Sequence, residues 1–332
     1  MITFLSSIRE GVNTVHKNWQ LVLLQIATMI LSCMGFFIIV GIPIAVAFVM
    51  FGLDLTEILK LTDAVSALKG STALLNKYFG MAVVIILSIL IYMTAIAVIW
   101  VFTIAGSVGV LSKSIIHEIS HFSLERFFRE GKKLFLPMLV FSLIMGGIFV
   151  STAFILGIIG GGASTVIDMA DGHEQTLAIF LRIFFYLVLI ALGIILILTT
   201  LSIAVFGTAD LAFRGSRAWQ AVKGAAKLIH DRPSSIGFYG LLLLGYIAAS
   251  FLMVFLMTPF TLIPIIGPLL YLPYHLVSYA VQGYVNLIII ASVLHYYRRV
   301  TAQDVSGGAD TSQTGEAGQT LPPAEISGNQ GD

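Results

Sequence analysis

One short segment of the chain has the residue types and spacing of a zinc site. His117-Glu118-Ile119-Ser120-His121 is an H-E-x-x-H sequence. On a helix, histidines four residues apart project from one face and can share a zinc ion, while the glutamate can act as general base toward the bound water. A membrane-embedded zinc metallopeptidase, with Glu118 as catalytic residue and His117 and His121 as metal ligands, is therefore one hypothesis for this chain.

A catalytic zinc also needs a third protein ligand. Glu125 continues the same helical face and cannot approach the metal from another direction. Four donors on other helices could supply the ligand: His16, Asp210, His230 and His295. None of these lies in a recognisable third-ligand motif. We therefore favour a chain without a cofactor, in which His117 and His121 lie at the lipid–water boundary, where a polar tip on an apolar body is stable.

A second set of polar residues forms a stripe in the last apolar segment. Ser278, Gln282 and Asn286 are spaced four residues apart, on one helical face, and His275 precedes them by three. Such a stripe could line a passive pore or facilitator. We favour hydrogen bonding between helices, which contributes about 0.6 kcal/mol per contact in membrane proteins. No charged residue lies at mid-depth in any predicted span, which argues against a charge-coupled transporter.

The composition requires that lipid surround these residues. Of 332 residues, 58% are hydrophobic and 11% are charged, and the mean hydropathy is +0.99. A soluble domain needs roughly 25% charged residues to face water. The net charge of +1 gives no reason to expect a nucleic-acid partner. The single cysteine, Cys33, lies in an apolar run and has no partner for an internal disulfide.

The chain contains enough apolar sequence for six transmembrane helices. A spanning helix needs about 20 mostly apolar residues. A proline-rich segment, 258–273, separates the last two spans as a tight turn or a shallow re-entrant segment. Residues 54–69 are amphipathic and predict a short helix on the outer leaflet. The predicted spans are 20–50, 80–111, 134–167, 177–207, 235–258 and 274–297.

The distribution of basic residues predicts the orientation. With a cytoplasmic N-terminus, 14 of the 18 Lys and Arg residues lie on the cytoplasmic side and 4 on the other. Positively charged loops favour the cytoplasm, so we expect a multi-pass protein of the cell (inner or plasma) membrane with both termini cytoplasmic. Residues 1–299 form the membrane domain, and the polar residues 300–332 predict a disordered cytoplasmic tail.

The cytoplasmic segments contain an internal repeat. Thr3 precedes Gly11 by eight residues, and the same spacing joins Ser123 to Gly131 and Ser216 to Gly224; Arg9-Glu10-Gly11 recurs as Arg129-Glu130-Gly131. Each segment predicts an interfacial amphipathic helix followed by two spans, and hence three pseudo-repeats in an all-α integral membrane fold. The basic residues expected to contact anionic lipid headgroups are Arg214, Arg217, Lys223, Lys227, Lys132 and Lys133.

On this layout and these spacings, residues 1–299 resemble the six-span membrane domain fused to some bacterial glycerophosphodiester phosphodiesterases, and are similar to its stand-alone relatives. The resemblance implies a membrane platform and transfers no catalytic residue. The sequence thus favours a non-enzymatic membrane protein that binds lipid headgroups or a partner protein. The zinc metallopeptidase and the passive pore or facilitator are the alternatives.

Overall fold

The fold is an all-α membrane fold. The computed structural model describes residues 2–58, 64–117, 122–172, 174–261 and 266–313, and these residues contain helices and no strand. Six of the helical stretches are long and apolar enough to cross a membrane, as the sequence predicts. They are Gln20–Met50, Phe79–Ile116, Leu124–Asp171, Gln175–Arg214, Ser234–Leu256 and Pro273–Ala302.

Nine α-helices and one π-helical segment make up the described part of the chain. The π-helical segment, Phe37–Gly41, begins directly after Phe36 and ends two residues before Pro43, a residue that removes a helical hydrogen bond. The α-helices are α1 (Ile2–Lys17), α2 (Gln20–Phe36), α3 (Ile42–Ile58), α4 (Ala64–His117), α5 (Leu124–Asp171), α6 (Gln175–Arg214), α7 (Ala218–Asp231), α8 (Ser234–Thr261) and α9 (Ile266–Gln313).

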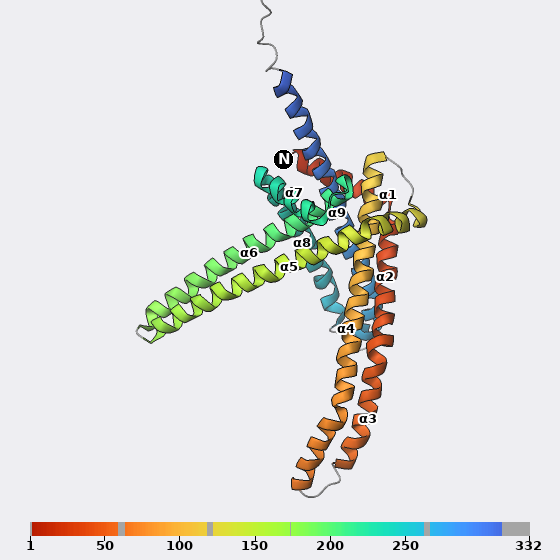
Figure 1. The fold of residues 1–332 in the computed structure, drawn as a ribbon, viewed down its shortest axis with the longest axis vertical. Coiled ribbons are helices and arrows are strands. Elements are labelled where there is room, and N and C mark those ends of the chain that lie inside the picture. Colours follow the sequence, from red (N-terminus) through yellow and green to blue (C-terminus); the bar gives the residue numbers. More distant parts are fainter. Residues whose placement is uncertain (1, 59–63, 118–121, 173, 262–265, 314–332) are drawn as a thin grey trace, which may run out of the picture.

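The helices converge at one end of the molecule and diverge toward the other (Figure 1). The hairpin of α2–α3 with α4 and the hairpin of α5 with α6 point in different directions from this shared end, where the short helices α1 and α7 also lie. In the most apolar window of the last span, 39% of the residues are buried, against at most 11% in the other five spans. The span within α9 is therefore the most buried of the six, and it contacts α2, α4, α6 and α8.

The buried core lies where the helices converge. Its largest cluster joins side chains of α6, α8 and α9, among them Phe206, Phe238 and Leu294, each at most 1% exposed. By contrast, α5 and α6 expose large apolar side chains along most of their length. With 48 and 40 residues, these helices are about 72 and 60 Å long, against a hydrocarbon core of about 30 Å. The hairpin therefore crosses at a steep tilt or extends beyond the core.

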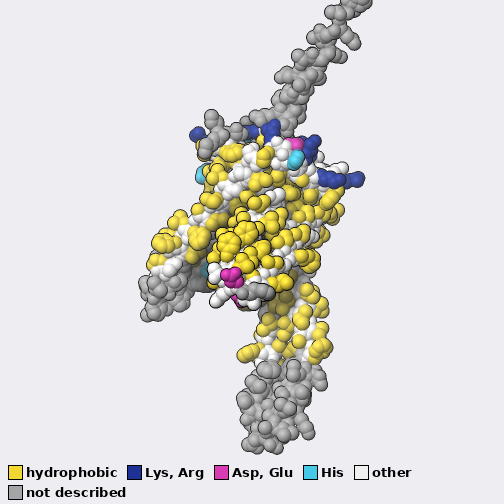
Figure 2. Space-filling view, turned by 90° about the vertical axis from the view of Figure 1, so that its left-hand side faces the viewer, with side chains coloured by type: hydrophobic (Ala, Val, Ile, Leu, Met, Phe, Trp, Pro, Cys, Tyr) yellow, Lys and Arg dark blue, Asp and Glu magenta, His cyan; other side chains and the backbone are white. Residues whose placement is uncertain are grey.

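Lys and Arg side chains gather at the convergent end, and hydrophobic side chains cover most of the rest of the visible face (Figure 2). We call the convergent end, formed by α1, α7 and residues 291–302 of α9, the basic end. Because charged groups avoid hydrocarbon, this division of the surface agrees with a molecule that is immersed in lipid below the basic end.

The three predicted interfacial segments differ in how they join their spans. A turn at residues 18–19 separates α1 from α2. Gly215 ends α6 in the left-handed conformation, with φ 63°, and so separates α7 from α6. The second segment continues without a break into the span of α5, with Pro137 inside the helix. It forms no separate interfacial helix of the predicted kind, because residues 124–136 and the span that follows are one continuous helix.

Three other predictions of local structure agree only in part with the observed helices. Residues 54–58 continue α3 and residues 64–69 begin α4, so they form no separate short helix; 59–63 lie outside the described residues. Helix α9 continues past residue 299 to Gln313, so residues 300–313 are helical where the sequence predicts a disordered tail; 314–332 are not described. The proline-rich segment does divide α8 from α9, although Pro273 lies inside α9.

Candidate anion-binding site at the basic end

Each of the three repeated glycines lies against a neighbouring helix. A Cβ atom on Gly11 would lie 2.8 Å from the backbone nitrogen of Ser292 in α9, and one on Gly131 would lie 3.5 Å from Gly106 Cα in α4. A Cβ atom on Gly224 would lie 3.5 Å from Asp210 Oδ1 in α6. At Gly11 the repeat therefore has a packing cause, because a side chain there would meet the backbone of α9. A Cβ atom at Gly131 would lie 3.0 Å from the Phe102 ring, and one at Gly224 would make ordinary contacts.

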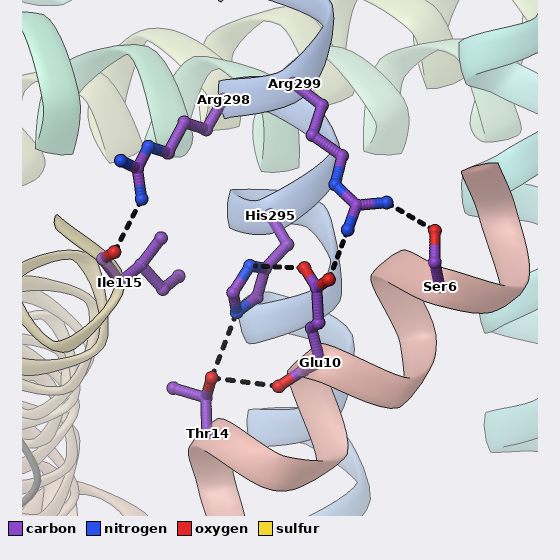
Figure 3. Close-up of polar contacts among 7 residues, drawn as sticks. All are labelled: Ser6, Glu10, Thr14, Ile115, His295, Arg298 and Arg299. Atoms are coloured by element: carbon purple, nitrogen blue, oxygen red, sulfur yellow. Dashed lines mark hydrogen bonds and ion pairs between the residues drawn. The ribbon is translucent and has the colours of Figure 1, made fainter. Parts of the chain in front are cut away.

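A polar cluster joins α1 to α9 beside the first of these glycines (Figure 3). The Glu10 carboxylate accepts a hydrogen bond from the Arg299 guanidinium and lies 3.1 Å from Nδ1 of His295. His295 Nε2 lies 2.9 Å from the hydroxyl of Thr14, and Arg299 also donates to Ser6. These contacts fix the amphipathic N-terminal helix to the central span by paired charges as well as by apolar packing.

A second cluster surrounds Asp210, which is 2% exposed, near the end of α6. Its carboxylate accepts hydrogen bonds of 2.5 Å from the Tyr297 hydroxyl and from Ser216 Oγ, and forms an ion pair of 3.5 Å with Arg214. The guanidinium of Arg214 also lies 5.9 Å from the centre of the Tyr297 ring. A buried carboxylate is tolerated here because each of these neighbours donates to it or pairs with its charge. Asp210 therefore positions Arg214 and Tyr297.

A pocket of about 340 Å³ opens beside this cluster, between α6, α7 and α9. This volume is at the lower end of the range of small-molecule sites. Its lining contains three cationic side chains and one carboxylate, so its net charge favours anions. The lining residues are Arg214, Gly224, Lys227, Leu228, Asp231, Arg232, Tyr297 and Thr301. We call these residues the basic pocket.

The structure brings together two of the six basic residues predicted to contact headgroups. Arg214 and Lys227 line the basic pocket. The other four, Arg217, Lys223, Lys132 and Lys133, are exposed outside it. Sequence reasoning missed Arg232 and Tyr297 as parts of this site. The only sequence signal for Arg232 is its position directly after α7, next to the basic face of that helix. No sequence pattern indicates Tyr297, because only the packing of α9 against α6 brings it to the site.

The apolar face of α7 packs against protein, where the sequence predicts contact with lipid. Val222 and Ile229 are each 7% exposed and belong to the two core clusters, whereas Trp219 is 54% exposed. The ammonium group of Lys223 lies 5.6 Å from the centre of the Trp219 ring. Helix α7 is therefore held by the core through its small and branched apolar residues, and it presents Trp219 with its basic face outward.

The candidate zinc ligands are only partly described. Glu118 and His121 lie outside the described residues, and of His117 only the backbone, at the end of α4, is described. Of the four possible third ligands, His295 and Asp210 are engaged in the two clusters, while His16 and His230 are exposed. Within the described ranges, no three His, Cys, Asp or Glu side chains are arranged to hold a metal.

The predicted polar stripe of α9 has members in different environments. Ser278 is buried, Gln282 is half-buried, and Asn286 is exposed and lines an apolar cavity. This cavity of about 380 Å³ lies between α4, α5, α6 and α9. Its lining is Val101, Ile104, Met138, Phe141, Ser142, Met145, Gly146, Phe149, Ala204, Val205, Thr208, Ala209, Asn286, Ile290, Val293 and Leu294.

Comparison with protein-family models, with curated proteins and with solved structures found no match. The fold therefore defines the class of the protein: an all-α membrane protein with six helices long and apolar enough to span. The chemistry of the basic end is the basis for any assignment beyond this class.

Proposed function

We propose that this chain is a non-enzymatic membrane platform whose basic end faces the cytoplasm and binds anionic lipid headgroups. The observation that carries the proposal is the basic pocket, whose lining contains three cations, Arg214, Lys227 and Arg232, and one carboxylate, Asp231. The 14-to-4 asymmetry of basic residues supports the cytoplasmic orientation. A platform role is also what the resemblance to the membrane domain of glycerophosphodiester phosphodiesterases implies.

The exposed basic residues around the pocket support the same function. Each basic residue near an anionic surface contributes about 1 kcal/mol, and salt screens this contribution. Arg214 contributes less than an isolated cation, because Asp210 already neutralises part of its charge. Lys223, Lys227 and Arg217 are exposed on or next to α7 and so point away from the core that holds this helix.

The test of this function changes the three exposed cations Arg217, Lys223 and Lys227 to glutamine in one variant. Glutamine has a helix propensity close to that of lysine, and Arg217 precedes the first residue of α7, so we expect the fold to be retained. Titration of fluorescent phosphatidylglycerol and phosphatidylcholine onto the purified chain should show wild-type preference for the anionic lipid. The variant should lose roughly a hundredfold of that preference, since three contributions of about 1 kcal/mol are removed.

The matched control changes a basic residue that lies away from the basic end. Arg182, in α6 near the tip of the α5–α6 hairpin, is replaced by glutamine and should leave the lipid preference unchanged. In 1 M salt, where the screening length is about 3 Å, the wild-type preference should also fall. Equal binding of the two lipids by the wild-type chain at low salt would overturn the proposed function.

A further inference from the structure

The apolar cavity between α4, α5, α6 and α9 lies at the depth of lipid acyl chains. On α9, Leu294 at one end precedes Arg298 by four residues, and Asn286 at the other end precedes it by twelve. At 1.5 Å per residue, the cavity extends from about 6 to about 18 Å below Arg298 along this helix. Half of the hydrocarbon core is about 15 Å thick. The cavity therefore lies within the leaflet next to the basic end.

The wall of the cavity is apolar and adaptable. Thirteen of its sixteen lining residues are apolar or glycine, and they include Met138 and Met145, whose flexible side chains adjust to an irregular occupant. The hydroxyl of Thr208 donates to the carbonyl of Ala204 at 2.8 Å, so it needs no ligand. A cavity wall without partner atoms loses dispersion contacts. In a membrane, the acyl chains of the surrounding lipids are the abundant apolar groups that can restore these contacts.

The cavity is accessible from outside the protein. Ile104, on its wall, is 37% exposed. A Cβ atom on Gly146, also on its wall, would meet no atom within 4 Å. We propose that this cavity binds one acyl chain of a membrane lipid from the leaflet next to the basic end. The proposal goes beyond headgroup binding, because it requires no charge on the lipid.

The test compares two adjacent glycines, only one of which lines the cavity. Gly146 lines the cavity and Gly147 does not, while a Cβ atom on either would meet nothing within 4 Å. The full chain is reconstituted with phosphatidylcholine that carries a photoreactive diazirine in the middle of one chain. Gly146→Phe should lower crosslinking to the cavity-lining peptides at least about fivefold, because a bulky side chain fills the space. Gly147→Phe should leave crosslinking at the wild-type level.

A third variant separates a hydrocarbon chain from a polar solute. Asn286→Leu makes the deep end of the cavity apolar, and crosslinking should persist or increase. Equal crosslinking in Gly146→Phe and Gly147→Phe, or loss of crosslinking in Asn286→Leu, would overturn the proposal. Because phosphatidylcholine is zwitterionic, these results do not depend on whether the basic pocket binds anionic headgroups.

Discussion

Replacing Gly11 with leucine is expected to detach α1 from α9 and to lower the apparent melting temperature of the protein by roughly 5 °C or more. A Cβ atom at this position would clash with Ser292 Oγ and would lie 2.8 Å from the backbone nitrogen of the same residue. The helices cannot separate to make room without breaking the contacts of Glu10 with His295 and Arg299. Thermal unfolding of the purified chain measures the change.

The matched control for this prediction is Gly237→Leu in α8. A Cβ atom on Gly237 would meet nothing within 4 Å, so leucine fits there without a shift of the backbone. Limited proteolysis provides a second measurement, since a detached α1 should be cut faster in Gly11→Leu and not in the control. Identical melting temperatures for wild type and Gly11→Leu would show that the two helices do not pack as described.

Replacing Asp210 with alanine is expected to destabilise the basic end by about 3 kcal/mol. The substitution leaves the buried Tyr297 hydroxyl without its acceptor and removes the partner of Ser216. Hydrogen bonds to a charged group contribute about 1.5–3 kcal/mol each. The ion pair with Arg214 adds little, because water screens this guanidinium, which is 59% exposed. Thermal unfolding should show the loss, and Asp210→Asn, which keeps one acceptor oxygen, should show a smaller one.

A double-mutant cycle tests whether Asp210 and Tyr297 act as a pair. Tyr297→Phe removes one donor to the carboxylate and should cost about 1–2 kcal/mol. In the double variant Asp210→Ala/Tyr297→Phe, the combined loss should be smaller than the sum of the single losses, because both substitutions remove the same hydrogen bond. Additive losses would contradict the contact between these two side chains.

Hydropathy was sufficient to predict the spans of this protein. Each predicted span lies within a described helical stretch, because the requirement for about 20 apolar residues is local in sequence. The repeat of glycines at Gly11, Gly131 and Gly224 was also visible. The reason for the glycine at Gly11 was not visible, because the atoms that a side chain there would meet belong to another helix, α9.

The candidate site could be predicted only in part. Asp210 and Tyr297 are 87 residues apart, and Glu10 and Arg299 are 289 apart, so neither contact follows from a local pattern. The amphipathic pattern of α7 identified its two faces correctly. It could not distinguish lipid from protein as the partner of the apolar face, since both are equally apolar, and the structure places Val222 in the protein core.

The proposed binding of cytoplasmic headgroups requires that the basic end lies on the cytoplasmic side of the membrane. Cys33 is the only cysteine, so Cys33→Ser provides a background in which one new cysteine reports its own position. Ala226, exposed on α7, and Glu174, at the turn between α5 and α6, are changed to cysteine one at a time. With a membrane-impermeant maleimide, Glu174→Cys should be labelled in intact cells and Ala226→Cys only after lysis. Labelling of Ala226→Cys in intact cells would contradict the proposed orientation and place the basic pocket on the outer face.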